Sequence, residues 1–425
     1  MICLRGNIKL ARISDRRKFK KHNRSGWLTH TSDTKPQTGY FSSNMSNPES
    51  PDLLFDVLWF TGINFKLTEK KTVCEKILRN SVCFLYLTGL VYSLGIRLRA
   101  FVVDDRGTMI ITEMLALVCC ILLWISLNVQ SRKIVSVHVT ISKNRIEDLF
   151  NVCSVFPNKF KKSKWMQVVA IITICSPLFS SAAAMLISKS SGENVDKHLN
   201  FLALGFKFKV GMYYKYILLF VLRSYDLSIC FVSSQMTCFL FSTLSYNVSL
   251  CVKETTDQLI SNVNDIDVFY TTGKAIKSYR RIQNIILGLE TAISLPLFYI
   301  MAFLLCELFA LMSNAIHLAR YGTSFSTMCI VLCAILITGF HAIVLIFCTS
   351  SIEENYRSMV RAFVCLPDDT LKPSYVRELL QMLKLLAFND NVQLTAWGMF
   401  PIRRGFFLTI VGTLATYGVL LVQFT

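Results

Sequence analysis

Apolar stretches long enough to cross a lipid bilayer recur along this chain and restrict its fold more than any other feature. A transmembrane helix needs about 20 consecutive apolar residues, and windows of that length predict seven spans. The predicted spans are 81–102, 109–127, 165–187, 213–241, 285–313, 327–347 and 405–423. With 53% hydrophobic and 17% charged residues, the chain is too apolar for an ordinary soluble domain. The sequence therefore predicts an all-α, seven-transmembrane protein.

The basic residues are distributed unevenly between the two sides of the predicted membrane. Most of the 45 Lys and Arg residues lie on one side, in 1–79, 129–164, 246–284 and 350–404, and few lie in the opposite loops, 103–108, 188–212 and 316–325. Because cytoplasmic loops carry an excess of Lys and Arg, we expect a cytoplasmic N-terminus and, after seven crossings, an extracellular C-terminus. Attraction to anionic membrane lipid accounts for the net charge of +18. We expect no binding of nucleic acid.

The segments outside the spans divide the chain into four regions. Residues 1–52 are basic and then rich in Ser, Asn and Pro, a composition typical of disorder. Residues 53–350 hold the first six spans, 351–404 form a cytoplasmic region, and 405–425 hold the last span. Within the third region, residues 374–396 have apolar side chains at helical spacing and predict an amphipathic helix.

Two further cytoplasmic linkers have helical character. Residues 129–164 and 246–284 mix apolar and charged side chains at helical spacing, and each adjoins a long apolar span. We therefore expect the membrane helices to continue past the surface of the bilayer.

The sequence contains no signature of catalysis or of a metal site. There is no phosphate-binding loop, nucleotide fingerprint, His-Glu-x-x-His motif or nucleophile elbow, so we predict no enzyme activity and no cofactor. None of the 15 cysteines lies in the loops assigned outside, so we expect no structural disulfide. Cys329 and Cys333 are four residues apart on a predicted helix but have no His or acidic residue beside them, which predicts no metal site.

Ionisable residues inside the predicted spans are candidates for function, because a charge is costly in a bilayer. Arg223 and Asp226 are three residues apart on one helix face and can form a structural ion pair. Glu113, Glu307 and His341 either face an aqueous ligand cavity or are satisfied polar groups within the bundle. Both interpretations remain open.

Three tyrosines stand at the start of the fourth span. Tyr213, Tyr214 and Tyr216 carry aromatic rings with hydroxyl groups, which suits a pocket that stacks and hydrogen-bonds small molecules. An interfacial aromatic belt explains the same residues equally well.

The last span differs from the others in its polar side chains. Thr409, Thr413, Thr416, Leu420 and Gln423 recur every three or four residues and form one mildly polar stripe on an apolar helix. Copies of this stripe around an axis predict a narrow pore with an apolar constriction at Leu420 and a ring of amides at Gln423. Alternatively, the threonine hydroxyls bond to their own helix, and Gln423 only reaches interfacial water.

The end of the chain resembles the C-terminal signature of the insect gustatory receptors. Thr416-Tyr417 and Gln423-Phe424 match that signature in order, spacing and position. Residues 396–400 and 403–408 are similar to the family's lead into its last span. Sugar-sensing members often have Glu where this chain has Gly418, so the resemblance favours a receptor for bitter or other non-sugar compounds.

The resemblance implies a tetrameric, ligand-gated cation channel with cytoplasmic anchor helices. Thr416 and Gln423 would face the pore, whereas Tyr417 and Phe424 would pack the C-terminal motif. The implied partners are a small tastant, permeant cations, membrane lipid and identical or related subunits, and the implied location is the plasma membrane of a sensory neuron dendrite.

Three alternatives remain beside this family. Insect odorant receptors share its architecture but generally end differently. A G-protein-coupled receptor would need an extracellular N-terminus and usually has an Asp-Arg-Tyr box after its third span, which this chain lacks. A transporter would be expected to have helices broken at matched places in two halves.

Overall fold

The described part of the chain is almost entirely helical. The computed structural model describes residue 63 and the ranges 73–103, 107–151, 164–190, 195–262, 268–320, 325–364 and 393–424. All of these residues belong to one compact unit, Ser50–Thr425. The predicted disordered segment 1–52 and most of the predicted amphipathic helix 374–396 lie outside the described residues.

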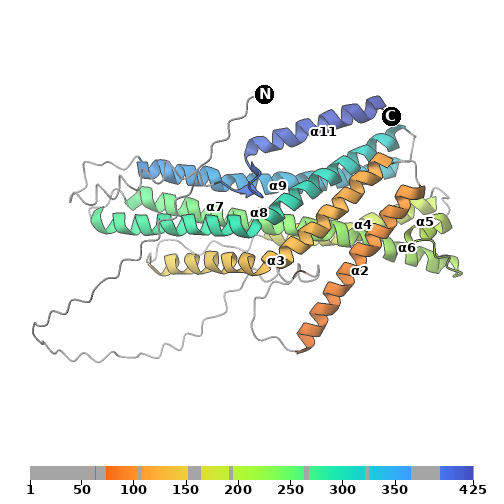
Figure 1. Ribbon diagram of the computed structural model, residues 1–425, viewed down its shortest axis with the longest axis horizontal. Helices are drawn as coiled ribbons and strands as arrows, with labels where there is room; N and C mark the ends of the chain where they lie inside the picture. Colours follow the sequence, from red (N-terminus) through yellow and green to blue (C-terminus); the bar gives the residue numbers. More distant parts are fainter. Residues whose placement is uncertain are drawn as a thin grey trace, which may run out of the picture. The chain divides into compact units, whose positions relative to one another are not determined.

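Figure 1 shows the helices of the described residues, which follow one another along the chain. They are α2 (Val73–Val103), α3 (Gly107–Asn151), α4 (Lys164–Ser190), α5 (Val195–Leu202), α6 (Met212–Leu227), α7 (Ser233–Asn262), α8 (Val268–Arg320), α9 (Phe325–Val364) and α11 (Arg404–Phe424). A π-helical turn, Ser228–Val232, joins α6 and α7 into one continuous helix. Two short strands, β1 (Thr395–Ala396) and β2 (Phe400–Pro401), pair antiparallel just before α11.

The predicted membrane helices are present in the structure. Within the described ranges, 6 helices are long and apolar enough to cross a membrane, and they contain Asn80–Val102, Ile110–Ile141, Met212–Asp257, Lys277–Arg320, Thr327–Arg361 and Arg404–Gln423. The remaining predicted span, 165–187, coincides with α4, which contains the shorter apolar run Ile171–Ala183. The prediction of an all-α membrane protein built from apolar helices is confirmed.

Several helices are longer than the spans predicted within them. α3 has 45 residues, α8 has 53 and α9 has 40, so each extends well beyond a bilayer-length segment of about 20 residues. The helical character of the linkers 129–164 and 246–284 is confirmed for the residues that the structure describes in them, up to Asn151 and Asn262 and from Val268 onward.

The core is formed by three long helices, α7, α8 and α9, which lie side by side, with α3 packed along α8 (Figure 1). The largest fully buried side chains include Met236, Phe241, Ile286, Phe303 and Tyr356. α7 and α9 run in the same direction, since the Cys238 thiol donates to the His341 carbonyl at 3.3 Å and the Asn355 amide donates to the Ser249 hydroxyl at 2.7 Å. Close van der Waals packing of this kind stabilises helix association in a membrane.

The hairpin formed by β1 and β2 attaches the start of α11 to the middle of α8. The Thr395 hydroxyl donates to the Glu290 carboxylate at 2.8 Å, and the Trp397 N–H donates to the Ser294 carbonyl at 3.0 Å. The indole of Trp397 also packs on the ring of Phe298, with centroids 5.5 Å apart. The hairpin therefore fixes the point at which the last helix leaves the core.

This hairpin corrects the C-terminal limit of the predicted amphipathic helix. The helix was expected to reach residue 396, but Thr395–Ala396 is a strand. Trp397 and Gly398 have positive φ values of 52° and 68°, which a right-handed helix cannot accommodate. The backbone groups near β1 bond instead to α8, so the helical sequence pattern is overruled by this long-range contact.

Candidate functional site

The polar stripe predicted on the last helix points away from the rest of the chain. Its five members are all exposed: Thr409, Thr413, Thr416, Leu420 and Gln423. On the opposite side of α11, Ile410 is buried and Leu414 packs against the main hydrophobic core. Only one side of α11 is therefore held by its own chain, and the stripe is free to meet other molecules.

The threonine hydroxyls in the stripe bond to their own helix, as the alternative interpretation of the sequence states. Thr413 donates to the Thr409 carbonyl at 2.8 Å, and Thr416 donates to the Gly412 carbonyl at 2.9 Å. A hydroxyl that donates its proton to the backbone still keeps two acceptor lone pairs. These exposed oxygens therefore remain able to coordinate a cation.

The C-terminal part of α11 packs closely on α8. The ring of Tyr417 lies on the ring of Phe309, with centroids 4.5 Å apart. Gly418 is so close to α8 that an added β carbon would lie 3.0 Å from the Met312 methyl carbon. Beyond it, the Arg320 guanidinium donates to the Val422 carbonyl at 3.1 Å. Tyr417 thus packs within its own chain, whereas the side chain of Phe424 is outside the described residues.

The N-terminal end of α11 is attached to α9 by charged residues. The Arg403 guanidinium lies 3.4 Å from the Glu353 carboxylate, and Arg404 pairs with Glu354. The Arg404 guanidinium also lies over the ring of Phe347, 5.7 Å from its centroid. Since α11 contacts α9 at one end and α8 along its length, a shift of either helix would be passed to the polar stripe.

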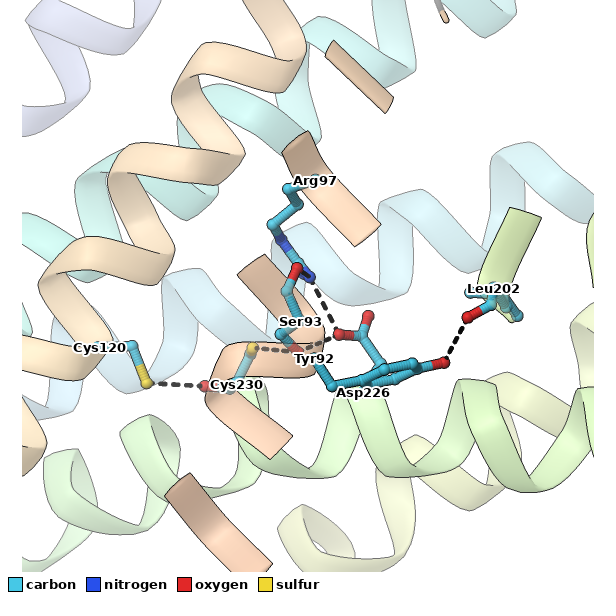
Figure 2. Close-up of polar contacts among 7 residues, drawn as sticks. All are labelled: Tyr92, Ser93, Arg97, Cys120, Leu202, Asp226 and Cys230. Carbon is cyan, nitrogen blue, oxygen red and sulfur yellow. Dashed lines mark hydrogen bonds and ion pairs between the residues drawn. The ribbon is translucent and has the colours of Figure 1, made fainter. Parts of the chain in front are cut away.

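A second polar cluster joins α2 to α6 and the π-helical turn (Figure 2). Asp226 receives hydrogen bonds from the Ser93 hydroxyl and from the Arg97 guanidinium, the latter at 3.0 Å. The Cys230 thiol donates to the Ser93 hydroxyl at 3.5 Å, and the Cys120 thiol donates to the Cys230 carbonyl. A charged pair that is largely removed from water is stable only when further hydrogen bonds support it, and here the Ser93 hydroxyl bonds to Asp226 while the Ser93 carbonyl accepts from Arg97 at 3.1 Å.

The π-helical turn creates polar groups that α2 satisfies. The hydroxyl of Tyr86 donates to the Ser233 hydroxyl at 2.6 Å and lies 3.1 Å from the Ile229 carbonyl. A π turn displaces the regular helical hydrogen bonds and often occurs at functional positions. In this protein the π turn begins at Ser228, two residues after Asp226, which forms the ion pair with Arg97.

The structure gives Asp226 a partner that the sequence did not indicate. Its ion pair is with Arg97, whereas Arg223 lies on the exposed side of α6. The Arg223–Asp226 pair stays a prediction. The signal for Arg97 was available, because an arginine within the predicted span 81–102 is itself an ionisable residue in a membrane segment.

Two of the predicted pocket residues belong electrostatically to this cluster. Glu307 of α8 is close enough to Glu113, Arg97 and Asp226 for their charges to act on it, and Glu113 of α3 acts likewise on Arg97. The cluster therefore draws ionisable side chains from α2, α3, α6 and α8 together. Among the described residues, no group of three or more His, Cys, Asp or Glu could hold a metal ion.

The third ionisable candidate, His341, lies in a separate polar seam between α7 and α9. Its Nδ1 is 2.8 Å from the Ile337 carbonyl and must donate, since a carbonyl only accepts, so the neutral ring leaves Nε2 as an acceptor. Gln235 lies on α7, three residues before Cys238, and Thr338 lies on α9, three residues before His341. Both are 0% exposed. Within the described structure, His341 Nε2, the Thr338 hydroxyl and both side-chain polar atoms of Gln235 have no hydrogen-bond partner.

Unsatisfied polar groups in a buried seam require an explanation. Each such group costs about 1–3 kcal/mol when it is buried without a partner. Since α7 and α9 run in the same direction, Gln235 and Thr338 lie at the same level, next to the Cys238–His341 contact. The seam thus presents the Gln235 amide, the Thr338 hydroxyl and the Nε2 acceptor of His341, which can bind a small polar molecule.

The three tyrosines at the start of α6 do not lie in this seam. Tyr213 and Tyr214 are 73% and 65% exposed and contact each other edge to face. Tyr216 packs against the small buried cluster of Val195, Leu199 and Leu219. The first two have the exposure of an interfacial aromatic belt, and the third supports the contact between α5 and α6.

Comparison with known proteins yields a similarity of structure and none of sequence. No family model matches this chain, and no curated protein matches it. The fold is similar to that of the olfactory receptor OR5 of the insect Machilis hrabei, with a TM-score of 0.61 both for the complex with eugenol and for a second structure of the same receptor. The identities are 14% and 16%, and each alignment covers 88% of this chain and 97% of that one. The chain therefore shares the fold of this receptor.

Proposed function

We propose that this chain is a subunit of a ligand-gated cation channel of the insect gustatory receptor type. The observation that carries the proposal is the exposed polar stripe of α11, on a helix that packs on its own chain along the other side only. The similarity of fold to an insect olfactory receptor and the C-terminal residues Thr416-Tyr417 and Gln423-Phe424 support the same function.

In this proposal, four copies of α11 surround one pore. Leu420 forms an apolar constriction, which can close a pore by excluding water, and Gln423 forms a ring of amides. Thr413 and Thr416 supply oxygen atoms without fixed charge. Such a lining conducts small cations with weak discrimination among them.

The ligand is a small molecule, and the seam between α7 and α9 is the part of the bundle best prepared to hold its polar groups. A hydroxyl or amine on the ligand can donate to Nε2 of His341, and the Gln235 amide can both donate and accept. Glu113 and Glu307, in the separate cluster around Arg97 and Asp226, are further candidates for contact with the ligand. A ligand that binds the open arrangement more tightly shifts the population towards it.

The proposed channel lies in the plasma membrane of a sensory neuron dendrite, with its N-terminus inside and its C-terminus outside. Epitope tags placed at each end test this topology in intact cells. A tag that is accessible only at the C-terminus supports the proposal. An accessible N-terminal tag contradicts it and favours a G-protein-coupled receptor.

Whole-cell recording tests the channel directly. Cells that express the chain should carry a tastant-dependent cation current, and Gln423→Ala should change its conductance or ion selectivity without reducing assembly. Val411→Ala is the matched control, because Val411 is also exposed on α11 but lies on a different side of the helix from the stripe. Equal currents from the wild type and Gln423→Ala would remove Gln423 from the pore.

An odorant receptor is the second candidate, and the structural similarity supports it equally. The receptor that shares the fold is olfactory, and one of its structures contains eugenol. A panel that contains both non-volatile bitter compounds and volatile aromatic compounds separates the two functions. Currents evoked only by the volatile compounds would replace the gustatory assignment.

A further inference from the structure

The connection between α5 and α6 has an alternating apolar and basic sequence at the edge of a membrane span. Residues 206–210 read Phe-Lys-Phe-Lys-Val and precede Met212, the first residue of an apolar span. All five residues are exposed, and the side chain of Phe206 is 72% exposed. Large apolar side chains gathered on a surface mark a site of contact with another molecule or with a membrane.

The backbone of this segment restricts where the segment can lie. The Phe206 N–H donates to the Ala203 carbonyl at 3.0 Å, but from Lys207 to Val210 neither the N–H nor the carbonyl groups bond to any described residue. Unpaired backbone groups are not tolerated in the hydrocarbon core of a bilayer. Exposed phenylalanine rings are in turn unfavourable in water. The headgroup layer of a membrane satisfies both requirements at once.

The start of the segment is fixed by contacts between α5 and α2. The Tyr92 hydroxyl donates to the Leu202 carbonyl at 2.8 Å (Figure 2), and the Arg99 guanidinium donates to the Asn200 carbonyl at 2.6 Å. The chain then turns at Gly205, whose φ of 97° suits glycine and whose α carbon lies beside the Arg99 guanidinium. The exposed side chains are thus presented from a held position.

The contact between α5 and α6 fixes the other end of the segment. The Lys215 ammonium lies 2.6 Å from the Asp196 carboxylate, and Val195, Leu199 and Leu219 form a small buried cluster between the two helices. α5 therefore serves as a support that holds residues 206–211 against the end of the membrane span.

We propose that residues 206–210 bind the phospholipids of the bilayer. Phe206 and Phe208 lie among the outer parts of the acyl chains, and the ammonium groups of Lys207 and Lys209 bind the lipid phosphates. Alternation suits this role, because successive side chains of an extended segment point to opposite sides. Lysine stems can lie along apolar surface while their charges reach the phosphate layer. The exposed Tyr213 and Tyr214 continue this contact as part of an aromatic belt.

Photocrosslinking identifies what covers the segment, and it does not depend on channel activity. The full chain with Phe208→p-benzoylphenylalanine is placed in nanodiscs of phosphatidylcholine and phosphatidylglycerol, irradiated and analysed by intact mass. We expect an adduct heavier by one phospholipid. The same replacement at Phe241, which is 0% exposed, should yield crosslinks within the chain only. A crosslinked dimer at position 208, or the absence of a lipid adduct there, would overturn the proposal.

A second measurement tests the role of the two lysines. The thermal stabilisation of the detergent-solubilised chain is titrated with phosphatidylglycerol. Each lysine near an anionic lipid surface strengthens association about fivefold at low ionic strength. Lys207→Gln with Lys209→Gln should therefore raise the half-maximal lipid concentration about 25-fold, relative to the wild type. Lys253→Gln with Lys277→Gln, two other exposed lysines, should raise it by a smaller factor. Equal effects of the two pairs would contradict the proposal.

Discussion

A β carbon added to Gly89 of α2 would lie 1.7 Å from Cδ1 of Ile229, so the backbone of α2 contacts the π-helical turn directly. Gly89→Ala must displace Ile229 or separate the two helices. Overpacking of a tight contact costs about 1–3 kcal/mol. We therefore expect a clear fall in the thermal unfolding temperature of the purified chain in detergent.

Two further variants show whether this clash is the cause. Gly339→Ala should have little effect, because a β carbon at that position would meet nothing within 4 Å. Ile229→Val removes the Cδ1 atom itself, so its combination with Gly89→Ala should recover part of the lost stability. No recovery would show that the loss arises elsewhere.

The ion pair between Arg97 and Asp226 predicts that Arg97 contributes more to stability than Arg223 does. The two side chains are largely removed from water, at 15% and 13% exposure, so loss of one partner leaves the other charge uncompensated at a cost of up to about 3–5 kcal/mol. Arg97→Gln should therefore lower the unfolding temperature far more than Arg223→Gln, since Arg223 is exposed. Joint replacement by apolar residues, Arg97→Met with Asp226→Leu, should be milder than Arg97→Gln alone. An equal loss for the two single arginine variants would favour the pair predicted from the sequence.

The apolar helices were predictable because bilayer thickness sets their length. A span needs about 20 apolar residues whatever lies beside it, so each window from 81–102 to 405–423 coincides with a helix. The stripe from Thr409 to Gln423 was predictable for the same local reason, because residues three and four apart share a helix face. Its exposure in the structure follows from the apolar side of α11 packing on α8.

The partners of polar groups were not predictable, because they depend on how helices distant in sequence pack. Asp226 is three residues from Arg223 in the sequence, but its ion pair is with Arg97, 129 residues away. The seam of Gln235, Thr338 and His341 likewise requires knowledge that α7 and α9 run in parallel. The strand at Thr395 overrides a helical pattern because its hydroxyl bonds to Glu290 on α8.

The hairpin before α11 yields a prediction about its attachment to α8. Thr395→Val keeps the shape of the side chain but removes the donor to Glu290, which leaves that carboxylate without this bond. The loss of one such hydrogen bond costs about 1–3 kcal/mol. We expect a lower unfolding temperature and, if the chain is the proposed channel, a shifted dose-response curve. Thr140→Val on α3 is the control, because the exposed Thr140 hydroxyl bonds to the Ser136 carbonyl of its own helix.

Gly418 and Gly412 lie on different sides of α11 and should therefore respond differently to the same substitution. A side chain at position 418 meets Met312 of α8 at 3.0 Å, whereas one at position 412 meets nothing within 4 Å. Gly418→Leu should push α11 away from α8, lower the unfolding temperature and alter the response to ligand. Gly412→Leu should leave stability nearly unchanged but narrow the proposed pore, so single-channel conductance should fall. If Gly412→Leu conducts as the wild type does, the stripe faces lipid and not the permeating ions.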